Sequence, residues 1–360
     1  MDTNRHLQAI ADMFIKRFEQ ISLDPCEQWL PVPSFSSQNA RGSLYSGGNR
    51  TRLDAVCALK GFKTAVWVSS AQARELGIYI LAGSIGSPIY WAGTEFINKN
   101  TGKVEKTMLW SDYEALSDIE KANYEKKDSL PREAYVFNIE QTDFPEKYPE
   151  LWKELTEAFS PPHVPIEKCE EFVHAATTHG WYPDGNNRCA VKFVDSPSAV
   201  YDMENNVIEM PLRSHYDDPK DFYRTLIGSI VDSAMSQIRV RRQKKDDGLE
   251  ALALSNLTEE IACSILRCRL GLEEIPSQQT LSSMKNWAEI ISGNPSCIRR
   301  VTSDAGAIID LVSSQLGVRN DLSADICDKI AKCLAQRQDS TKARKIKKGN
   351  GRWSRRPSLG

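Results

Sequence analysis

The chain has 360 residues, of which 41% are hydrophobic and 26% charged, and its formal net charge is -2. This composition is typical of globular proteins and excludes wholesale disorder, and the length favours two domains of ordinary size. The longest apolar runs are much shorter than the roughly 20 residues that a membrane-spanning helix needs. The first residues also lack the layout of a signal peptide. We therefore expect a cytoplasmic protein with no membrane contact.

Nine cysteines are spread along the chain, and no two of them form a Cys-x-x-Cys pair. A chain of this length does not need disulfide bonds to compensate for a small core. We expect these cysteines to be reduced thiols in the interior.

The C-terminal end is strongly basic. Residues 341–360 contain eight lysines and arginines and no acidic residue, so the rest of the chain carries a net charge of -10. Such a segment cannot bury enough apolar surface to fold, which predicts a disordered basic tail over residues 336–360. The tail has two interpretations: a solubilising extension, or an arm that contacts phosphates directly. Its candidate DNA contacts are Lys345, Lys347, Lys348 and Arg352.

Hydrophobic periodicity predicts an α+β domain over residues 1–150. Apolar residues at helical spacing indicate an amphipathic helix over residues 3–21, and the Ser-, Gly- and Pro-rich residues 25–49 indicate a long loop. The predicted elements that follow are helices over 54–59 and 70–76 and strands over 64–68, 78–81, 88–96 and 134–137, the last after a solvated helix.

The proline-rich stretch 145–165 is the predicted domain boundary. Beyond it we expect a mostly helical domain over residues 165–335 with a small sheet, which makes the fold class α+β with two domains. The predicted strands cover 189–194 and 198–210, and the predicted helices cover 166–178, 219–240, 257–270, 281–292, 303–316 and 323–335.

The helix that begins at Pro219 carries a changed metal-binding pattern. Positions 228 and 232 lie one turn apart on one flank, which is the spacing by which zincin metallopeptidases direct two histidines at one zinc ion. In this chain the two positions are Gly228 and Asp232, with Ser229 beside the first.

The surrounding sequence resembles the zincin-like domain of ArdC-type antirestriction proteins. The resemblance lies in the run before the family's His-Glu-x-x-His helix, at residues 198–201, 206–211 and 222–226. It implies that Gly228, Ser229 and Asp232 stand in the places of a ligand, the general base and a second ligand. All three positions have changed.

The next helix of the family supplies a carboxylate ligand, and residues 257–262 resemble that helix, with Glu260 as the counterpart. The neighbouring Glu259 fits a capping box with Asn256 at the helix start. A catalytic zinc needs three protein ligands and a base for its bound water, so we expect no metal, no cofactor and no peptidase activity. A metallopeptidase with unusual ligands, using Asp232, Glu260 and a histidine such as His215, is the alternative.

The N-terminal domain resembles the single-stranded DNA-binding domain of the same family, in residues 44–49, 67–77, 82–90 and 136–142. Residues 41–80 hold six basic residues against two acidic ones, with aromatic residues between them. Aromatic side chains in a basic groove bind single strands by stacking and phosphate attraction, without reading bases. The candidate DNA contacts in the domain are Tyr45, Asn49, Arg50, Arg52, Lys63, Trp67 and Gln72.

The resemblance therefore implies sequence-independent binding of single-stranded DNA by a protein of a plasmid or other mobile element, in antirestriction or conjugative transfer. Its expected partners are single-stranded DNA and a host restriction or transfer protein. A pseudoenzyme whose former catalytic cleft docks a host protein is a further alternative.

Overall fold

The computed structural model describes residues 3–25, 28–33, 35–91, 94–105, 113–128, 132–159, 166–242, 248–272, 275–318 and 329. Its contacts divide the chain into two compact units: residues 88–135 form the smaller one, and the chain on both sides of it forms the larger one. The smaller unit lies within the predicted first domain, and the domain boundary expected at residues 145–165 stays a prediction. No described helix is long and apolar enough to cross a membrane.

The first helix, α1 (Thr3–Leu23), confirms the expected amphipathic helix. Its apolar stripe is buried, with at most 6% exposure at Leu7, Ile10, Phe14, Phe18 and Ile21. This stripe packs mainly against α11 (Gln278–Gly293) from the other end of the chain.

A four-stranded sheet in the order β1-β2-β7-β3 follows. β1 (Gln38–Asn39) pairs parallel with β2 (Val66–Ser69), and β2 pairs antiparallel with β7 (Arg132–Asn138). The remaining strand, β3, covers Ser87–Trp91. The expected strand at 64–68 is therefore β2, shifted by one or two residues.

Two helices flank β2 in the sequence. α2 (Gly47–Lys60) begins well before residue 54, because its first turn is made by the glycine-rich stretch that sequence composition assigned to a loop. α3 (Ser70–Leu76) starts at a capping box between Ser69 and Gln72, as expected for residues 70–76. The strand expected at 78–81 is only an isolated bridge between Ile80 and Thr142.

The smaller unit contains a sheet in the order β5-β4-β6. Its strands are β4 (Thr94–Asn98), β5 (Lys103–Val104) and β6 (Tyr124–Asp128), and α5 (Asp118–Lys121) is a single turn. The rings of Phe96 and Tyr113 stack in its core at 4.6 Å. The single strand expected at 88–96 is thus two strands, and the described part of the expected solvated helix contains the short helix α5 and the strand β6.

After the sheets the larger unit continues through η1 (Ile139–Gln141), α6 (Phe144–Lys147), α7 (Pro149–Phe159) and α8 (Ile166–His174), whose last residues run into a π-helical turn, η2 (Ala175–His179). A second small sheet has the order β8-β10-β9. Its strands are β8 (Ala190–Val194), β9 (Val200–Asp202) and β10 (Val207–Pro211), and η3 (Arg213–His215) leads out of it.

Four long helices complete the larger unit: α9 (Pro219–Arg242), α10 (Leu249–Arg269), α11 and α12 (Cys297–Leu316). α10 begins eight residues before residue 257, so Asn256 lies inside the helix and the expected capping box with Glu259 was wrong. The helix expected at 323–335 and the basic tail lie outside the described residues, apart from Lys329.

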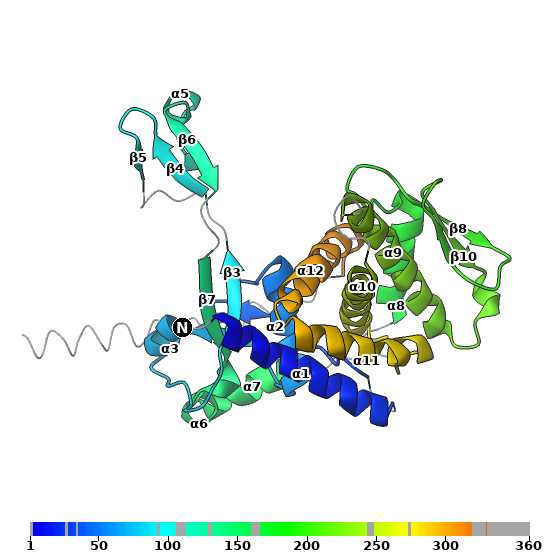
Figure 1. Cartoon of the computed structure of the whole chain (residues 1–360), viewed down its shortest axis with the longest axis horizontal. Coiled ribbons are helices and arrows are strands. Elements are labelled where there is room, and N and C mark those ends of the chain that lie inside the picture. Colours follow the sequence, from blue (N-terminus) through cyan, green and yellow to red (C-terminus); the bar gives the residue numbers. More distant parts are fainter. Residues whose placement is uncertain are drawn as a thin grey trace, which may run out of the picture. The chain divides into compact units, whose positions relative to one another are not determined.

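The helices from the two ends of the chain pack together rather than forming separate bodies. In Figure 1, α12 lies beside α2, and α11 runs along α1. α10 contacts α9, α11 and α12. The six cysteines that the structure describes are buried, as expected for core thiols.

Candidate functional site

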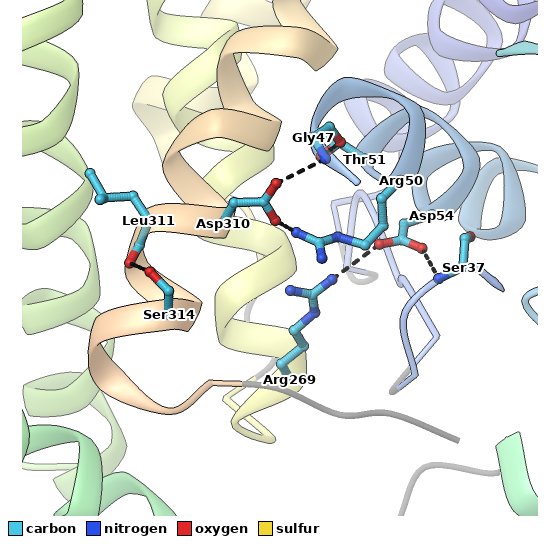
Figure 2. A network of polar contacts seen from close by, with 9 residues as sticks. All are labelled: Ser37, Gly47, Arg50, Thr51, Asp54, Arg269, Asp310, Leu311 and Ser314. Atoms are coloured by element: carbon cyan, nitrogen blue, oxygen red, sulfur yellow. Dashed lines mark hydrogen bonds and ion pairs between the residues drawn. The ribbon is translucent and has the colours of Figure 1, made fainter. Parts of the chain in front are cut away.

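The glycine-rich first turn of α2 is fixed by a carboxylate from α12. The Gly47 N–H donates to Asp310 Oδ2 at 2.8 Å, and the Arg50 guanidinium forms an ion pair with the other oxygen of Asp310 (Figure 2). A carboxylate is stabilised at this position because the first N–H groups of a helix are unpaired and carry partial positive charge. Gly47 has a φ of 51°, a conformation that favours glycine.

α2 and α12 approach each other very closely at two glycines. A Cβ at Gly306 would lie 2.7 Å from the Gly48 nitrogen, and a Cβ at Gly48 would lie 2.6 Å from Ser303 Cα. Since a real Cβ does not come that close to another heavy atom, glycine is needed on both helices at this crossing.

A second ion pair lies deeper in the same junction. Arg269 of α10 contacts Asp54 of α2 at 3.1 Å, and their side chains are only 2% and 3% exposed. Asp54 also accepts a hydrogen bond of 2.8 Å from the Ser37 N–H (Figure 2). We call Arg50, Asp54, Arg269 and Asp310 the junction cluster.

Three of the predicted DNA contacts are buried. Arg50 is 7% exposed, Arg52 2% and Trp67 fully buried. Arg52 donates to Asn49 Oδ1 at 3.3 Å, and the Trp67 indole donates to Ser37 Oγ at 3.1 Å. DNA therefore cannot contact these three side chains in this conformation, and their assignment to a DNA surface is corrected here.

The other predicted contacts are placed differently. Tyr45 is half-buried, and desolvation raises its pKa to about 12. Gln72 closes the capping box of α3, whereas the Lys63 side chain is exposed. The four tail residues Lys345, Lys347, Lys348 and Arg352 lie outside the described residues.

An exposed aromatic side chain that the sequence did not single out as a contact lies in the loop after α3. Tyr79 is 74% exposed, and Leu81 and Ile85 in the same loop are 48% and 39% exposed. The Lys147 ammonium lies 5.4 Å from the centre of the Tyr79 ring. Sequence reasoning counted Tyr79 among the aromatic residues of this region but not among the DNA contacts, because residues 78–81 resemble a half-buried strand.

The Tyr79 loop is held in place by backbone hydrogen bonds. The Tyr79 N–H donates to Asp143 Oδ1 at 2.7 Å, and the Asp143 N–H donates back to the Tyr79 carbonyl at 3.0 Å. The Leu81 N–H donates to the Gln141 carbonyl at 2.9 Å. The exposed side chains are thus presented by an ordered segment.

The changed metal-binding pattern lies on α9. Gly228, Ser229 and Asp232 are all partly exposed there. The Ser229 hydroxyl donates to the Thr225 carbonyl of its own helix at 3.1 Å. Gly228 has no side-chain atom that could bind a metal, and Ser229 cannot take a proton from a metal-bound water as a carboxylate would.

Glu260 on α10 has a partner from the N-terminal part of the chain. The Trp29 indole N–H donates to Glu260 Oε1 at 3.2 Å and to Ser264 Oγ at 2.8 Å. Trp29 is 2% exposed, and Ser264 lies one turn from Glu260 on the same face of the helix. Glu260 therefore helps to hold the N-terminal segment against α10.

An arginine of α10 lies against Gly228. Arg267 Nη2 donates to the Arg224 carbonyl of α9 at 3.2 Å. The same nitrogen would lie 3.5 Å from a Cβ placed at Gly228. The guanidinium thus enters the space beside the first of the former ligand positions.

The segment before α9 is fixed by an exposed ion pair. Both terminal nitrogens of Arg213 donate hydrogen bonds to the Glu170 carboxylate, at 2.7 and 2.8 Å. The Arg213 guanidinium also lies 4.3 Å from the centre of the Phe222 ring. These hydrogen bonds, with one from the Tyr223 hydroxyl, hold the pKa of Glu170 below its ordinary value.

Comparison with known proteins agrees with this arrangement. Residues 4–137 match the N-terminal domain of anti-restriction factor ArdC, and residues 186–304 match a zincin-like metallopeptidase domain. No curated protein sequence matches the chain. The metal-free crystal structure of the antirestriction protein ArdC from plasmid R388 is similar with a TM-score of 0.53 and 20% identity, over 87% of this chain and 98% of that one. The chain has the two-domain architecture of ArdC-type proteins.

The Mn(II)-bound structure of the same R388 protein is similar with a TM-score of 0.52, again at 20% identity, over 88% of this chain and 98% of that one. Whether this chain can hold a metal depends on its own residues. Within its described residues, no three His, Cys, Asp or Glu side chains come together as a metal site would require. His215, the histidine nearest in sequence, contacts Asp195 at 2.9 Å instead. The residues present do not fit a zincin metal.

Proposed function

We propose that this ArdC-type protein binds single-stranded DNA without sequence preference, in the cytoplasm, and serves a mobile element in antirestriction or DNA transfer. We further propose that its zincin-like region performs no metal-dependent hydrolysis. Its partners are then single-stranded DNA and a host restriction or transfer protein.

The domain content supports the biological role. An ArdC N-terminal domain followed by a zincin-like domain is the content that the chain shares with the antirestriction protein of plasmid R388. The match extends over 98% of that protein. The antirestriction role is therefore proposed for the whole chain rather than for one part of it.

The exposed Tyr79 is the observation that carries the DNA-binding proposal. Its ring is 74% exposed on an ordered loop, with the Lys147 ammonium beside it. An aromatic ring next to a cation provides the two contacts that single strands use, base stacking and phosphate attraction. The exposed Lys60, Lys63 and Arg74 add positive charge in the same domain, and the half-buried Tyr45 and Asn49 border the loop before α2.

The basic tail supplies further charge. Its eight basic residues, which include Lys345, Lys347, Lys348 and Arg352, are not offset by any acid in residues 341–360. Binding that relies on such residues releases counterions and weakens steeply as salt rises. The tail then adds affinity, while the folded domain provides the preference for single strands.

A single substitution tests the stacking surface. Tyr79→Ala should weaken binding of a labelled single-stranded oligonucleotide by about tenfold or more, because one base–aromatic stack contributes about 1–3 kcal/mol. Leu23→Ala is the matched control, since Leu23 is 87% exposed and lies at the end of α1. Unchanged affinity of the Tyr79 variant in fluorescence anisotropy would remove Tyr79 from the DNA surface.

Truncation after Ser340 tests the tail separately. The shortened protein should still prefer single over double strands, and the slope of its salt dependence should fall by about 0.7 for each phosphate that the tail no longer neutralises. If only the full-length chain binds, and binds both strand types equally, the folded part is not the DNA site. It would then be better interpreted as a module that docks a host protein.

A further inference from the structure

The zincin-like region has α9 and α10, the counterparts of the helices that carry the metal ligands in the family, but α9 lacks those ligands. The structure shows which side chain reaches toward α9 instead. α9 and α10 pack against each other as the two helices that would supply ligands. Gly228 and Asp232 lie one turn apart on α9, and Glu260 lies on α10. A metal ion held by these positions would lie between the two helices.

Arg267 reaches into this space from α10. It lies two turns after Glu260, so the two residues project from nearly the same face of the helix. Its Nη2 is fixed by the Arg224 carbonyl at 3.2 Å. In the described part of the chain, that nitrogen is the only heavy atom from outside α9 that lies within 4 Å of a Cβ placed at Gly228. The guanidinium is therefore the group that faces the former ligand position.

We infer that Arg267 has taken the place of the metal: its guanidinium fills the space that a histidine at position 228 would need and supplies the positive charge there. A Cβ at position 228 fits at 3.5 Å from Nη2. An imidazole beyond that Cβ, in a rotamer directed at α10, would meet the guanidinium, because the helix allows few side-chain rotamers. A divalent cation is also repelled by a guanidinium that stays charged at any accessible pH.

The remaining family position has a structural role as well. Glu260 accepts the indole N–H of Trp29, and the same N–H is shared with Ser264. A hydrogen bond of this kind orients a carboxylate and does not by itself exclude a metal from it. The inference therefore places the obstacle at Arg267: restoring the family's ligands on α9, with Arg267 in place, does not restore the metal site.

Metal binding by two full-length variants tests this. The first carries Gly228→His, Ser229→Glu and Asp232→His, and the second adds Arg267→Ala. After dialysis against zinc, the first should hold less than one zinc per chain. The second should hold one and bind it at least about tenfold more tightly, the effect expected of groups that surround a metal site. Adding Lys285→Ala to the first variant, which removes an exposed charge on α11, is the control and should change nothing.

If the multiple variants fold poorly, a double-mutant cycle of Gly228 and Arg267 tests the same inference. In urea unfolding, Gly228→His should destabilise the protein, and Arg267→Ala in the same chain should relieve most of that loss. Strict additivity of the two substitutions would overturn the inference, as would a first variant that binds zinc as tightly as the second. Failure of DNA binding would not affect it, because neither measurement involves DNA.

Discussion

Two regions where distant parts of the chain meet contrast in how they use charge. At the junction of α2 with α10 and α12, four charged residues form two ion pairs, one of them almost completely buried. At the α9–α10 face, the positions that resemble the family's ligands and base hold Gly228, Ser229 and Asp232, and Arg267 lies against the first of them. The first region is a polar core, and the second is, by our proposal, a metal site whose positions now have structural contacts.

The difference shows that a count of basic residues does not identify a nucleic-acid surface. Arg50 and Arg52 contribute to the positive charge of residues 41–80, yet both side chains are buried. Buried charges need interactions within the protein, and Arg50 pairs with Asp310 while Arg52 donates to Asn49. The side chains of Lys63 and Tyr79, by contrast, are exposed to solvent.

The largest expected effect concerns the buried pair of the junction cluster. Asp54→Ala should lower the free energy of unfolding by about 3–5 kcal/mol, because it removes the carboxylate that pairs with the buried Arg269 charge. Urea unfolding followed by circular dichroism measures this change. The matched control is Glu75→Ala, which breaks the Arg41–Glu75 pair of 2.8 Å at the surface.

That control should cost less than about 1 kcal/mol, since exposed ion pairs contribute little. Equal losses for the two variants would mean that burial does not distinguish the junction from an ordinary surface pair.

The glycine crossing of the junction should be almost as sensitive. Gly306→Ala places a methyl group 2.7 Å from the Gly48 nitrogen, so α12 must shift away from α2. Overpacking of this kind costs about 1–3 kcal/mol. Gly293→Ala, at the exposed end of α11 with no described atom within 4 Å of its Cβ, serves as the control and should not destabilise. A neutral Gly306 variant would show that the two helices are not held so closely.

A glycine-to-alanine substitution should have the opposite effect on stability where α9 packs against α10. Gly228→Ala puts its Cβ at an ordinary distance, 3.5 Å, from the flexible end of Arg267. Alanine is favoured over glycine inside a helix by about 0.5–1 kcal/mol. Thermal unfolding should therefore show a small stabilisation. A loss as large as that of Gly306→Ala would mean that Gly228 is needed for a closer approach than the structure shows.

The smallest effect is a pH dependence at Glu170. Hydrogen bonds from Arg213 and Tyr223 lower its folded-state pKa from the ordinary 4.5. The ionised carboxylate therefore stabilises the fold above pH 4.5, and this contribution is lost as the pH falls through the folded-state pKa. Glu170→Gln should be less stable than the parent by under about 1 kcal/mol near neutral pH.

The difference between Glu170→Gln and the parent should shrink in acid, measured by unfolding at about pH 3 and about pH 6. A difference that grows in acid would contradict the assigned direction of the shift.

Much of the secondary structure could be predicted from the sequence, because it depends on local patterns. The apolar stripe of α1, the capping box of α3 and the start of α9 at Pro219 are each encoded within a few residues. The start of α2 was missed because its first residues, Gly47 and Gly48, favour a loop locally. They form a helix only because Asp310 and the close passage of α12 fix them.

The two candidate sites differ in how much the sequence reveals. The changes at Gly228, Ser229 and Asp232 are visible because they lie within one motif. The approach of Arg267 to Gly228, and of Trp29 to Glu260, joins residues far apart in the chain and follows no local pattern. Burial of Arg50 and exposure of Tyr79 are likewise set by the packing of whole helices and loops.

The most direct test of metal-independent DNA binding is the affinity of metal-stripped, full-length protein for single-stranded and double-stranded oligonucleotides, measured by fluorescence anisotropy with and without added zinc or manganese. We predict tighter binding of single strands and the same affinity under all metal conditions. Binding that appears only after metal is added, or no preference between strand types, would contradict this interpretation of the protein.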